Sequence, residues 1–274
     1  MAMAKRVRTA SMGLLVDFHY SDTWADPGKQ AKPAAWEKLD LAGLKKAVYD
    51  HTHSVLSDLR QQRTSPDMVQ IGNEVTNGML WPDGRAASST TSHQFDNFAE
   101  LVKAGTAATR DVDPKIKIVL HHDKGNNNKA VRWWLDNLIS RGVRFDIIGL
   151  SCNTDGPAES WKANFDDLAA RYPQYGLLAA EYSYRKRELN DIVYHAPDRR
   201  GLGSFIWEPT RHHEAIFDQN NQSAGAGTQR PPRPAPRPAP NPLAAPAHRA
   251  RTGRFDTNDW IKLYPQMVKD YADK

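Results

Sequence analysis

Cysteine is almost absent from this 274-residue sequence. Cys152 is the single example, so no disulfide can form within the chain. That alone does not identify a compartment, because many secreted enzymes also lack disulfides. No apolar run approaches the roughly 20 residues that a membrane-spanning helix needs, so we expect no membrane partner. The opening residues MAMAKRVR have no apolar stretch after their charges, so we expect no signal peptide in this chain.

An excess of positive over negative charge is also absent outside one segment. The net charge is +5, but arginines cluster in a proline-rich stretch from Arg230 to Arg254, and the remaining chain is close to neutral. This distribution favours a solvated basic loop over a nucleic-acid surface, with weak contact to an anionic surface as the alternative. Residues 229–254 are predicted to be a disordered or semi-extended insertion within one domain spanning residues 1–274.

Six apolar, strand-like runs recur along the chain. They are Gly13–His19, Met68–Asn73, Ile116–His121, Phe145–Ser151, Gly176–Glu181 and Gly203–Trp207. Nearly continuous apolar runs predict strands that are covered on both faces, as in a parallel sheet.

Segments of helical pattern lie between these runs. They are Leu41–Arg60, His93–Asp111, Asn128–Arg141 and Trp161–Tyr172, with further helical patterns over Ala2–Ala10 and Asn258–Tyr271. Gly142 is expected to end the third of them. The alternation of strand and helix predicts an α/β protein, either a barrel or an open doubly wound sheet.

Two glutamates stand at the ends of two apolar runs. Glu74 ends MVQIGNE and Glu181 ends LLAAE. Carboxylates at the carboxyl ends of parallel strands are typical of barrel enzymes, and a pair of them is the equipment for cleaving a glycosidic bond. Each glutamate alone is equally consistent with a salt bridge at the rim of a barrel.

A dense polar and aromatic segment, Asp17–Pro27, follows the first run. Sugar-binding sites combine hydrogen-bonding side chains with aromatic rings that stack on the apolar face of a sugar. On this basis the candidate substrate-binding residues are His19, Asp22, Trp24, Asn73, Trp81, His121, Tyr182 and Trp207. Core packing is the alternative role for each tryptophan, and it is the role expected for Trp133 and Trp134.

Two histidine pairs raise the question of a metal: His121-His122-Asp123 and His212-His213-Glu214. Neighbouring residues on a strand point to opposite faces, so adjacent histidines rarely bind one ion together. We therefore expect neither a metal nor another cofactor.

Several motifs together resemble those of the family 53 glycoside hydrolases. They are GLLVDFHYSDTWADPGKQ (13–30), MVQIGNEVTNGMLWPDG (68–84), FDIIGLS (145–151), AAEYSY (179–184) and FIWEP (205–209). The resemblance implies a (β/α)8 barrel and a retaining endo-β-1,4-galactanase acting on the galactan side chains of pectin. By that likeness, Glu74 matches the acid/base and Glu181 the nucleophile, and an extracellular or periplasmic location is expected.

Two departures from that family pattern stand out. The segment Cys152-Asn153-Thr154 replaces the Tyr-Tyr-Pro sequence that usually follows the sixth strand, so an aromatic wall is expected to be missing. The resemblance also makes the run at Gly13 the third strand, so about six of eight β/α units are expected. An incomplete barrel of this kind exposes strand edges, and we interpret the chain as a shortened form of the enzyme.

Two other functions remain open at this point. The chain could be a non-catalytic carbohydrate-binding protein that keeps the cleft without turnover, which release of reducing sugar from galactan would decide. Alternatively, the segment Arg230–Arg254 could act as a basic adaptor. The oligomeric state is not predicted.

Overall fold

The computed structural model describes residues 1–86, 92–153 and 157–208 of the chain. The chain divides into two compact units, Met1–Phe205 and Ile206–Lys274, and only the first three residues of the second unit are described. The proline-rich stretch 229–254, the expected helix 258–271 and the pair His212-His213 therefore lie outside the described residues. The prediction of a single domain stays a prediction.

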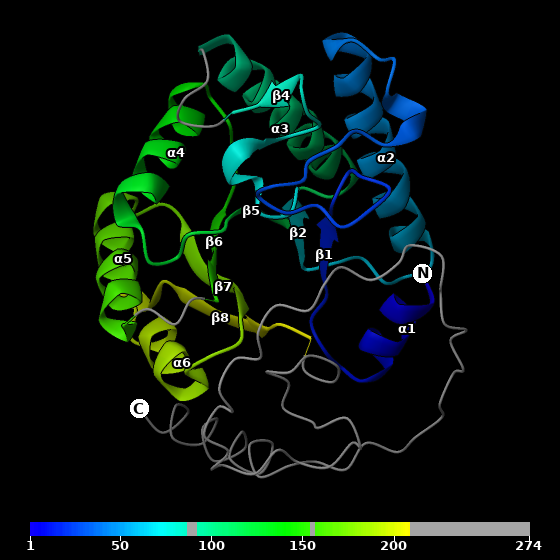
Figure 1. The fold of residues 1–274 in the computed structure, drawn as a ribbon. Helices are drawn as coiled ribbons and strands as arrows, with labels where there is room; N and C mark the ends of the chain where they lie inside the picture. Colours follow the sequence, from blue (N-terminus) through cyan, green and yellow to red (C-terminus); the bar gives the residue numbers. More distant parts are fainter. Residues whose placement is uncertain (87–91, 154–156, 209–274) are drawn as a thin grey trace, which may run out of the picture. The chain divides into compact units, whose positions relative to one another are not determined.

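Six strands form one sheet in the order β1-β2-β5-β6-β7-β8, with parallel pairing at every step from β1 to β7 (Figure 1). Their bounds are β1 Leu15–Phe18, β2 Met68–Ile71, β5 Lys117–His122, β6 Ile147–Cys152, β7 Gly176–Tyr182 and β8 Gly201–Ile206. All six predicted runs are strands, and the arrangement is an incomplete (β/α)8 barrel, as the sequence predicted. A short hairpin of β3 (Gly78–Met79) and β4 (Gly84–Arg85) forms a separate two-stranded sheet that was not foreseen.

One helix precedes the first strand, and the others lie between successive strands of the large sheet and cover one of its faces (Figure 1). They are α1 Ala2–Thr9, α2 Leu41–Gln61, α3 Ser92–Val112, α4 Asn128–Ser140, α5 Ala158–Arg171 and α6 Lys186–Tyr194, with short 3₁₀ turns at Ala34–Trp36, Val75–Asn77 and Pro197–Arg199. The helix α6 was missed because its sequence is mostly charged and polar. Only Leu189 and Val193 of this helix are fully buried.

Local signals in the sequence set several helix ends. The Asp40 carboxylate accepts a hydrogen bond from the Gly43 N–H at the start of α2, and the Asn127 side chain accepts one from the Ala130 N–H at the start of α4. Gly142 follows α4 with φ +74°, a left-handed conformation that glycine adopts without steric cost.

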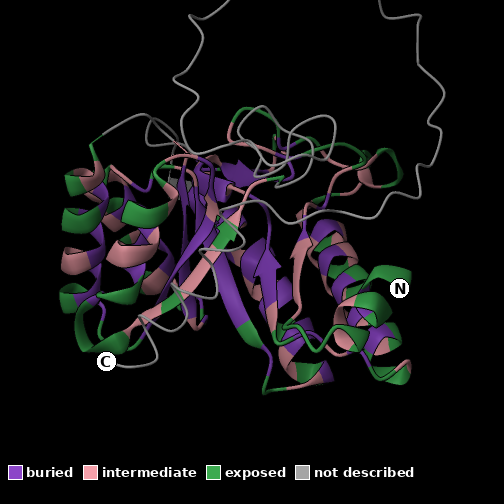
Figure 2. Ribbon diagram, turned by 90° about the horizontal axis from the view of Figure 1, so that it is seen from below, coloured by how far each residue is buried: buried purple, intermediate pink, exposed green. Residues whose placement is uncertain are grey.

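The helix-facing side of the sheet holds the larger core. Trp134, Trp161 and Phe98 are fully buried there, and Figure 2 shows each helix buried along one side and exposed along the other. Trp133 departs from the prediction of a core residue. It is 40% exposed, and its ring contacts Phe95 of α3 near the surface.

The opposite face of the sheet is built in two layers. Its lower layer is an apolar cluster without any helix residue: Leu15, Met68, Val119, Ile147, Leu178 and Ala180. Side chains alternate along a strand, so residues two positions further on share this face. That step leads to polar side chains, namely Asp17, Gln70 and His121. A polar layer therefore lies above an apolar floor at the carboxyl ends of the strands.

The strand β8 is less buried than the prediction of fully covered strands implies. Leu202 is 48% exposed and Phe205 is 43% exposed, whereas β5, β6 and β7 are almost wholly buried. Among the described strands β8 lies at one edge of the sheet, so it has one strand neighbour instead of two.

Candidate active site

Glu74 lies immediately beyond β2, where the backbone turns sharply. Gly72 has φ +85° and Glu74 itself has φ +46°, an unusual left-handed conformation for a residue with a side chain. Its Oε1 accepts a hydrogen bond from the Ser151 hydroxyl of β6 at 2.5 Å, and its backbone N–H donates to Nδ1 of His121 at 3.3 Å. The turn therefore directs the Glu74 carboxyl toward the polar layer of β5 and β6.

Glu181 lies near the carboxyl end of β7, beside the same serine. Its Cα is in register with that of Ser151, after an irregularity in pairing in which Ala180 has no partner on β6. Asn153 donates a long hydrogen bond of 3.4 Å to Oε2 of Glu181. Because Ser151 is both the hydrogen-bond donor to Glu74 and the strand neighbour of Glu181, the two glutamates lie on either side of this serine.

The two carboxyls also interact electrostatically. The pKa of Glu181 is raised to about 8, first by burial, then by the negative charges of Glu74 and Asp17. The pKa of Glu74 is also raised, mainly by burial and further by Asp123, Asp26 and Asp17, while the hydrogen bond from Ser151 lowers it. Burial is thus the main cause of the raised pKa at Glu74, ahead of the neighbouring carboxylates. Two carboxyls in this situation resist double ionisation and hold a shared proton near neutral pH.

Asp17 brings a third carboxyl into the site, from β1. Its Oδ2 lies 3.3 Å from Nε2 of His19, while its Oδ1 is buried and has no hydrogen-bond partner among the described residues. The His19 Nδ1 accepts a hydrogen bond from the Ala25 N–H, which leaves the proton on Nε2, facing Asp17. The His19 ring also lies at a T-shaped angle to the ring of Trp24, whose side chain is 61% exposed and presents an aromatic surface to solvent.

Asn73 holds the loop after β1 against the strand ends. Its Nδ2 donates to the Ala25 carbonyl at 2.9 Å, and its Oδ1 accepts from Nε2 of Gln70 at 3.3 Å. The Gln30 side chain donates to the Asn73 carbonyl, so the segment carrying His19 and Trp24 is fixed to the residue before Glu74.

The neighbours His121 and His122 point to opposite faces of β5, as predicted. The His121 ring is fully buried in the polar layer beside Asn73 and Ser151. His122 instead packs edge-on against Trp134 of α4. Burial lowers the pKa of both rings to about 3, so both are neutral. Among the described residues, no three His, Cys, Asp or Glu side chains form a group that could hold a metal ion.

Other predicted binding residues are Asp22, Trp81 and Trp207. The Asp22 carboxylate accepts the Ala34 N–H and so shapes the loop. Trp81 donates its indole N–H to the Asn77 carbonyl, and the Arg85 guanidinium covers one face of its ring at 4.5 Å. Trp207 belongs to the second unit, so its place in the site stays a prediction.

Tyr182 lies on the helix side of β7 and not in the cleft. It is buried, and its hydroxyl accepts a hydrogen bond from Asn190 of α6. The pairing irregularity before Glu181 shifts the alternation of side chains, so Glu181 takes the cleft face and Tyr182 the helix face.

The sequence did not single out three residues that the structure brings into the site. Ser151 lay hidden at the end of the apolar run FDIIGLS, and Asn153 was noted only as a departure from the family pattern. Asp17 could have been found, because it lies two residues before His19 on the same face of β1.

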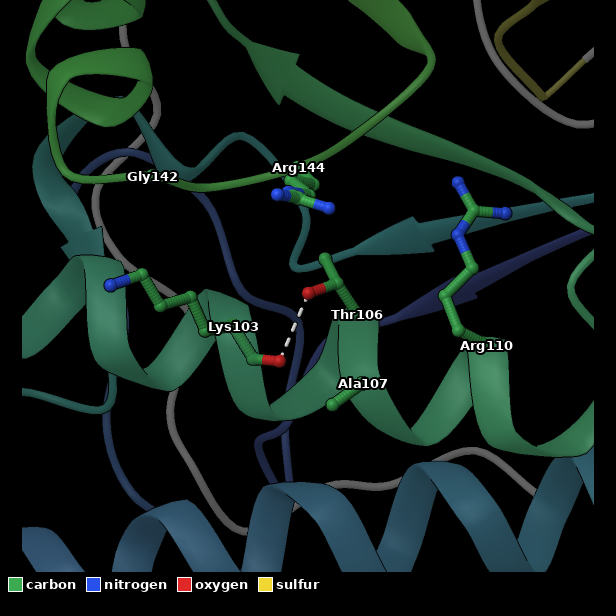
Figure 3. Close-up of a pocket in the computed structure, with 6 residues that line it drawn as sticks. All are labelled: Lys103, Thr106, Ala107, Arg110, Gly142 and Arg144. Carbon is green, nitrogen blue, oxygen red and sulfur yellow. Dashed lines mark hydrogen bonds between the residues drawn. The ribbon is translucent and has the colours of Figure 1, made fainter.

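A cavity of about 340 Å³ lies elsewhere, between α3 and the loop before β6 (Figure 3). It is lined by Lys103, Thr106, Ala107, Arg110, Gly142 and Arg144. Arg110 pairs there with Asp146, which immediately precedes β6, whereas the glutamates lie at the carboxyl ends of their strands. Lys103 pairs with Glu100. The cavity therefore lies at the amino ends of the strands, away from the glutamates. Two of its cationic groups already form ion pairs.

An arc of parallel strands with paired carboxyls at its carboxyl edge defines a barrel-type glycoside hydrolase site. The family model for glycosyl hydrolase family 53 matches residues 1–191, and the chain belongs to that family.

Three relatives show how far the likeness extends. A Niallia circulans protein described as an uncharacterized protein in the bgaB 5′ region is 38% identical over 76% of this chain and 67% of its own length. The arabinogalactan endo-β-1,4-galactanase of Thermothelomyces thermophilus is 29% identical over 78% of this chain and 73% of its own length. The solved catalytic domain of an Ignisphaera aggregans family 53 hydrolase has a TM-score of 0.70 and 33% identity, over 76% of this chain and 66% of that domain.

The chain therefore spans about two thirds to three quarters of the length of these relatives. Among the described residues, no helix is both long and apolar enough to cross a membrane.

Proposed function

We propose that this chain carries the catalytic glutamates of a retaining endo-β-1,4-galactanase that acts on galactan or arabinogalactan outside the cytoplasm. The observation that carries the proposal is the convergence of Glu74 and Glu181 on Ser151 at the carboxyl edge of the sheet. The naming of family relatives as arabinogalactan endo-β-1,4-galactanases supports the choice of substrate.

In this mechanism Glu181 is the nucleophile and Glu74 is the general acid and base. The Glu181 carboxylate attacks the anomeric carbon while protonated Glu74 gives its proton to the departing glycosidic oxygen, which forms a glycosyl–enzyme ester. Glu74 then removes a proton from the incoming water, which attacks the same carbon and releases Glu181. The two displacements together retain the anomeric configuration.

The chemistry needs the shared proton of the pair to be on Glu74. Positive charge develops at the anomeric carbon in the transition state, and it stabilises an ionised Glu181 directly beneath it. In the free chain, burial and then the charges of Glu74 and Asp17 raise the pKa of Glu181.

The surrounding side chains suit a sugar ligand. The buried Oδ1 of Asp17 has no hydrogen-bond partner among the described residues, so pairing it with a sugar hydroxyl would recover lost hydrogen-bond energy. The exposed ring of Trp24 offers a stacking surface next to His19.

The test is release of reducing sugar from potato galactan by the chain and by Glu74→Ala and Glu181→Ala. Each variant should abolish hydrolysis while binding of galactan persists. With an aryl β-galactoside, whose leaving group departs without protonation, azide should rescue Glu74→Ala by attacking the glycosyl–enzyme ester and giving a β-galactosyl azide, because the nucleophile is intact. The matched control Glu188→Ala removes an exposed carboxyl on α6 and should keep full activity. Substantial hydrolysis by either site variant would refute the assignment, and binding without hydrolysis by the unaltered chain would make it a carbohydrate-binding protein.

A further inference from the structure

Three hydrogen-bonded contacts connect the backbone N–H of Glu74 to its own side-chain carboxyl, through His121 and Ser151. Its backbone N–H donates to Nδ1 of His121 at 3.3 Å, Nε2 of His121 lies 2.8 Å from the Ser151 hydroxyl, and that hydroxyl donates to Oε1 of Glu74 at 2.5 Å. His121 and Ser151 are both buried, at 0% and 3% exposure.

Only one tautomer of His121 lets every contact in this ring form. The ring is neutral because burial lowers its pKa to about 3, so a single nitrogen carries hydrogen. With the proton on Nε2, the ring donates to Ser151, Ser151 donates to Glu74, and Nδ1 accepts the Glu74 N–H. With the proton on Nδ1, the Glu74 N–H loses its acceptor, and the Ser151 hydroxyl turns away from the carboxylate.

Asn73 offers the one competing contact, since its Oδ1 lies 3.1 Å from Nδ1 of His121. The Asn73 Nδ2 donates to the Ala25 carbonyl, so the amide oxygen does face the ring. That oxygen already accepts from Gln70, however, whereas His121 is the one acceptor that the described residues provide for the backbone N–H of Glu74. An unpaired buried donor costs more than a weakened second contact to an acceptor, so the Nε2–H tautomer prevails.

We propose that His121 and Ser151 are positioning residues that reserve Oε1 of Glu74 as a hydrogen-bond acceptor and leave the catalytic proton to Oε2. The bonding pattern stands on the geometry, and its catalytic meaning rests on the function proposed above. The Ser151 hydroxyl can donate to Oε1 whether Glu74 is ionised or protonated, so it holds the carboxyl in one orientation through both steps.

The protons balance on one oxygen throughout the reaction. Oε2 gives its proton to the glycosidic oxygen as the carbon–oxygen bond breaks, and it later takes a proton from water as the new bond forms. Oε1 keeps the same donor in both steps, so Glu74 needs no rotation between its roles as acid and base.

Ser151 also acts on the pKa of Glu74, in the direction opposite to burial and the nearby carboxylates. The carboxyl groups that act on the pair come from every neighbouring strand end or loop: Asp17 of β1, Asp26 of the following loop, Asp123 after β5 and Glu181 of β7. Among the interactions of Glu74, the hydrogen bond from Ser151 lowers its pKa, while burial and three aspartates raise it. His121 is neutral and so adds no charge of its own.

The test measures tautomer and titration directly by NMR, and so needs no turnover. Imidazole ¹⁵N shifts of the full chain, with His121 identified as the resonance pair missing from His121→Gln, should show hydrogen on Nε2. A ¹³C-carboxyl titration should show the pKa of Glu74 rising by about one unit in Ser151→Ala, because a hydrogen bond to a charged group is worth about that much.

Matched variants separate this role from a merely structural one. Ser151→Thr keeps the hydroxyl and should restore the titration, and Ser183→Ala, a buried serine elsewhere on the strand end, should leave it unchanged. In an active chain, Ser151→Ala should lower kcat about tenfold with KM nearly unchanged.

Hydrogen on Nδ1, or a Glu74 pKa that stays the same or falls in Ser151→Ala, would overturn the proposal. An inactive chain that shows the expected tautomer and titration would contradict the proposed function alone.

Discussion

Replacing Glu181 by glutamine should make the chain more stable at alkaline pH, although it removes the proposed nucleophile. The pKa of Glu181 is raised from 4.5 to about 8 in the folded chain, mainly by burial. Between those two pH values the unfolded chain has released this proton and the folded chain still holds it. The stability of the folded state therefore falls as pH rises from about 4.5 to about 8, and it stays low above that range.

The size of the effect follows from the same shift. One pKa unit corresponds to about 1.4 kcal/mol, so the full rise would correspond to roughly 5 kcal/mol. Partial exposure to solvent and coupling to Glu74 reduce this, and we expect on the order of 2–3 kcal/mol. Glutamine keeps the shape of the side chain without a group that ionises, so Glu181→Gln should gain that amount at pH 9 and very little at pH 5.

Urea unfolding at pH 5, 7 and 9 measures the difference, and thermal unfolding should show a gain in Tm of roughly 5–10 °C at pH 9. Glu188→Gln controls for the loss of one carboxylate at an exposed position of α6. A difference between Glu181→Gln and the unaltered chain that does not grow with pH would show that Glu181 is not held in a buried, mutually repelling pair.

Three further outcomes follow from the packing and the loop geometry. Trp134→Ala should cost about 3–5 kcal/mol of unfolding free energy in urea, because the ring is fully buried between α4 and the sheet. Asp40→Ala should cost about 1 kcal/mol in the same assay, since the Gly43 N–H loses its cap, and no change would contradict that cap. Trp24→Ala should weaken binding of galacto-oligosaccharides several-fold by calorimetry with Tm nearly unchanged, because this ring is 61% exposed; unchanged affinity would exclude it from the site.

The sequence predicted the six strands well because each is a short, mostly apolar run, and β2, β5, β6 and β7 are also largely buried. It missed α6, whose burial depends on two residues, and the hairpin of β3 and β4, whose strands are only two residues long. Trp133 was placed in the core on helical position alone, yet its ring lies at the outer edge between α3 and α4. Amphipathic patterns locate helices, but they do not say how far a neighbouring helix extends over a given ring.

Within the site, the two glutamates and the loop after β1 were predictable from strand ends. The sequence could not show that Glu181, and not Tyr182, faces the cleft. That orientation depends on a single extra residue of β7 in its pairing with β6. Ser151 was invisible for a different reason. A serine at the end of an apolar run has no distinctive neighbours in sequence. Its partners are Glu74, just beyond β2, and His121 of β5, which lie 77 and 30 residues away.

The apolar and polar layers on the sheet face opposite the helices limit how this site can change during evolution. A slip of one residue in any strand would turn its carboxyl, imidazole or hydroxyl group toward the helices and bring a helix-facing aliphatic chain into the groove. Such a change in register would bury charged groups among the helices and expose apolar side chains in the groove, so it would destabilise the fold. The polar residues at the strand ends are therefore expected to be gained or lost together, whereas the loops that follow the strands can change one residue at a time.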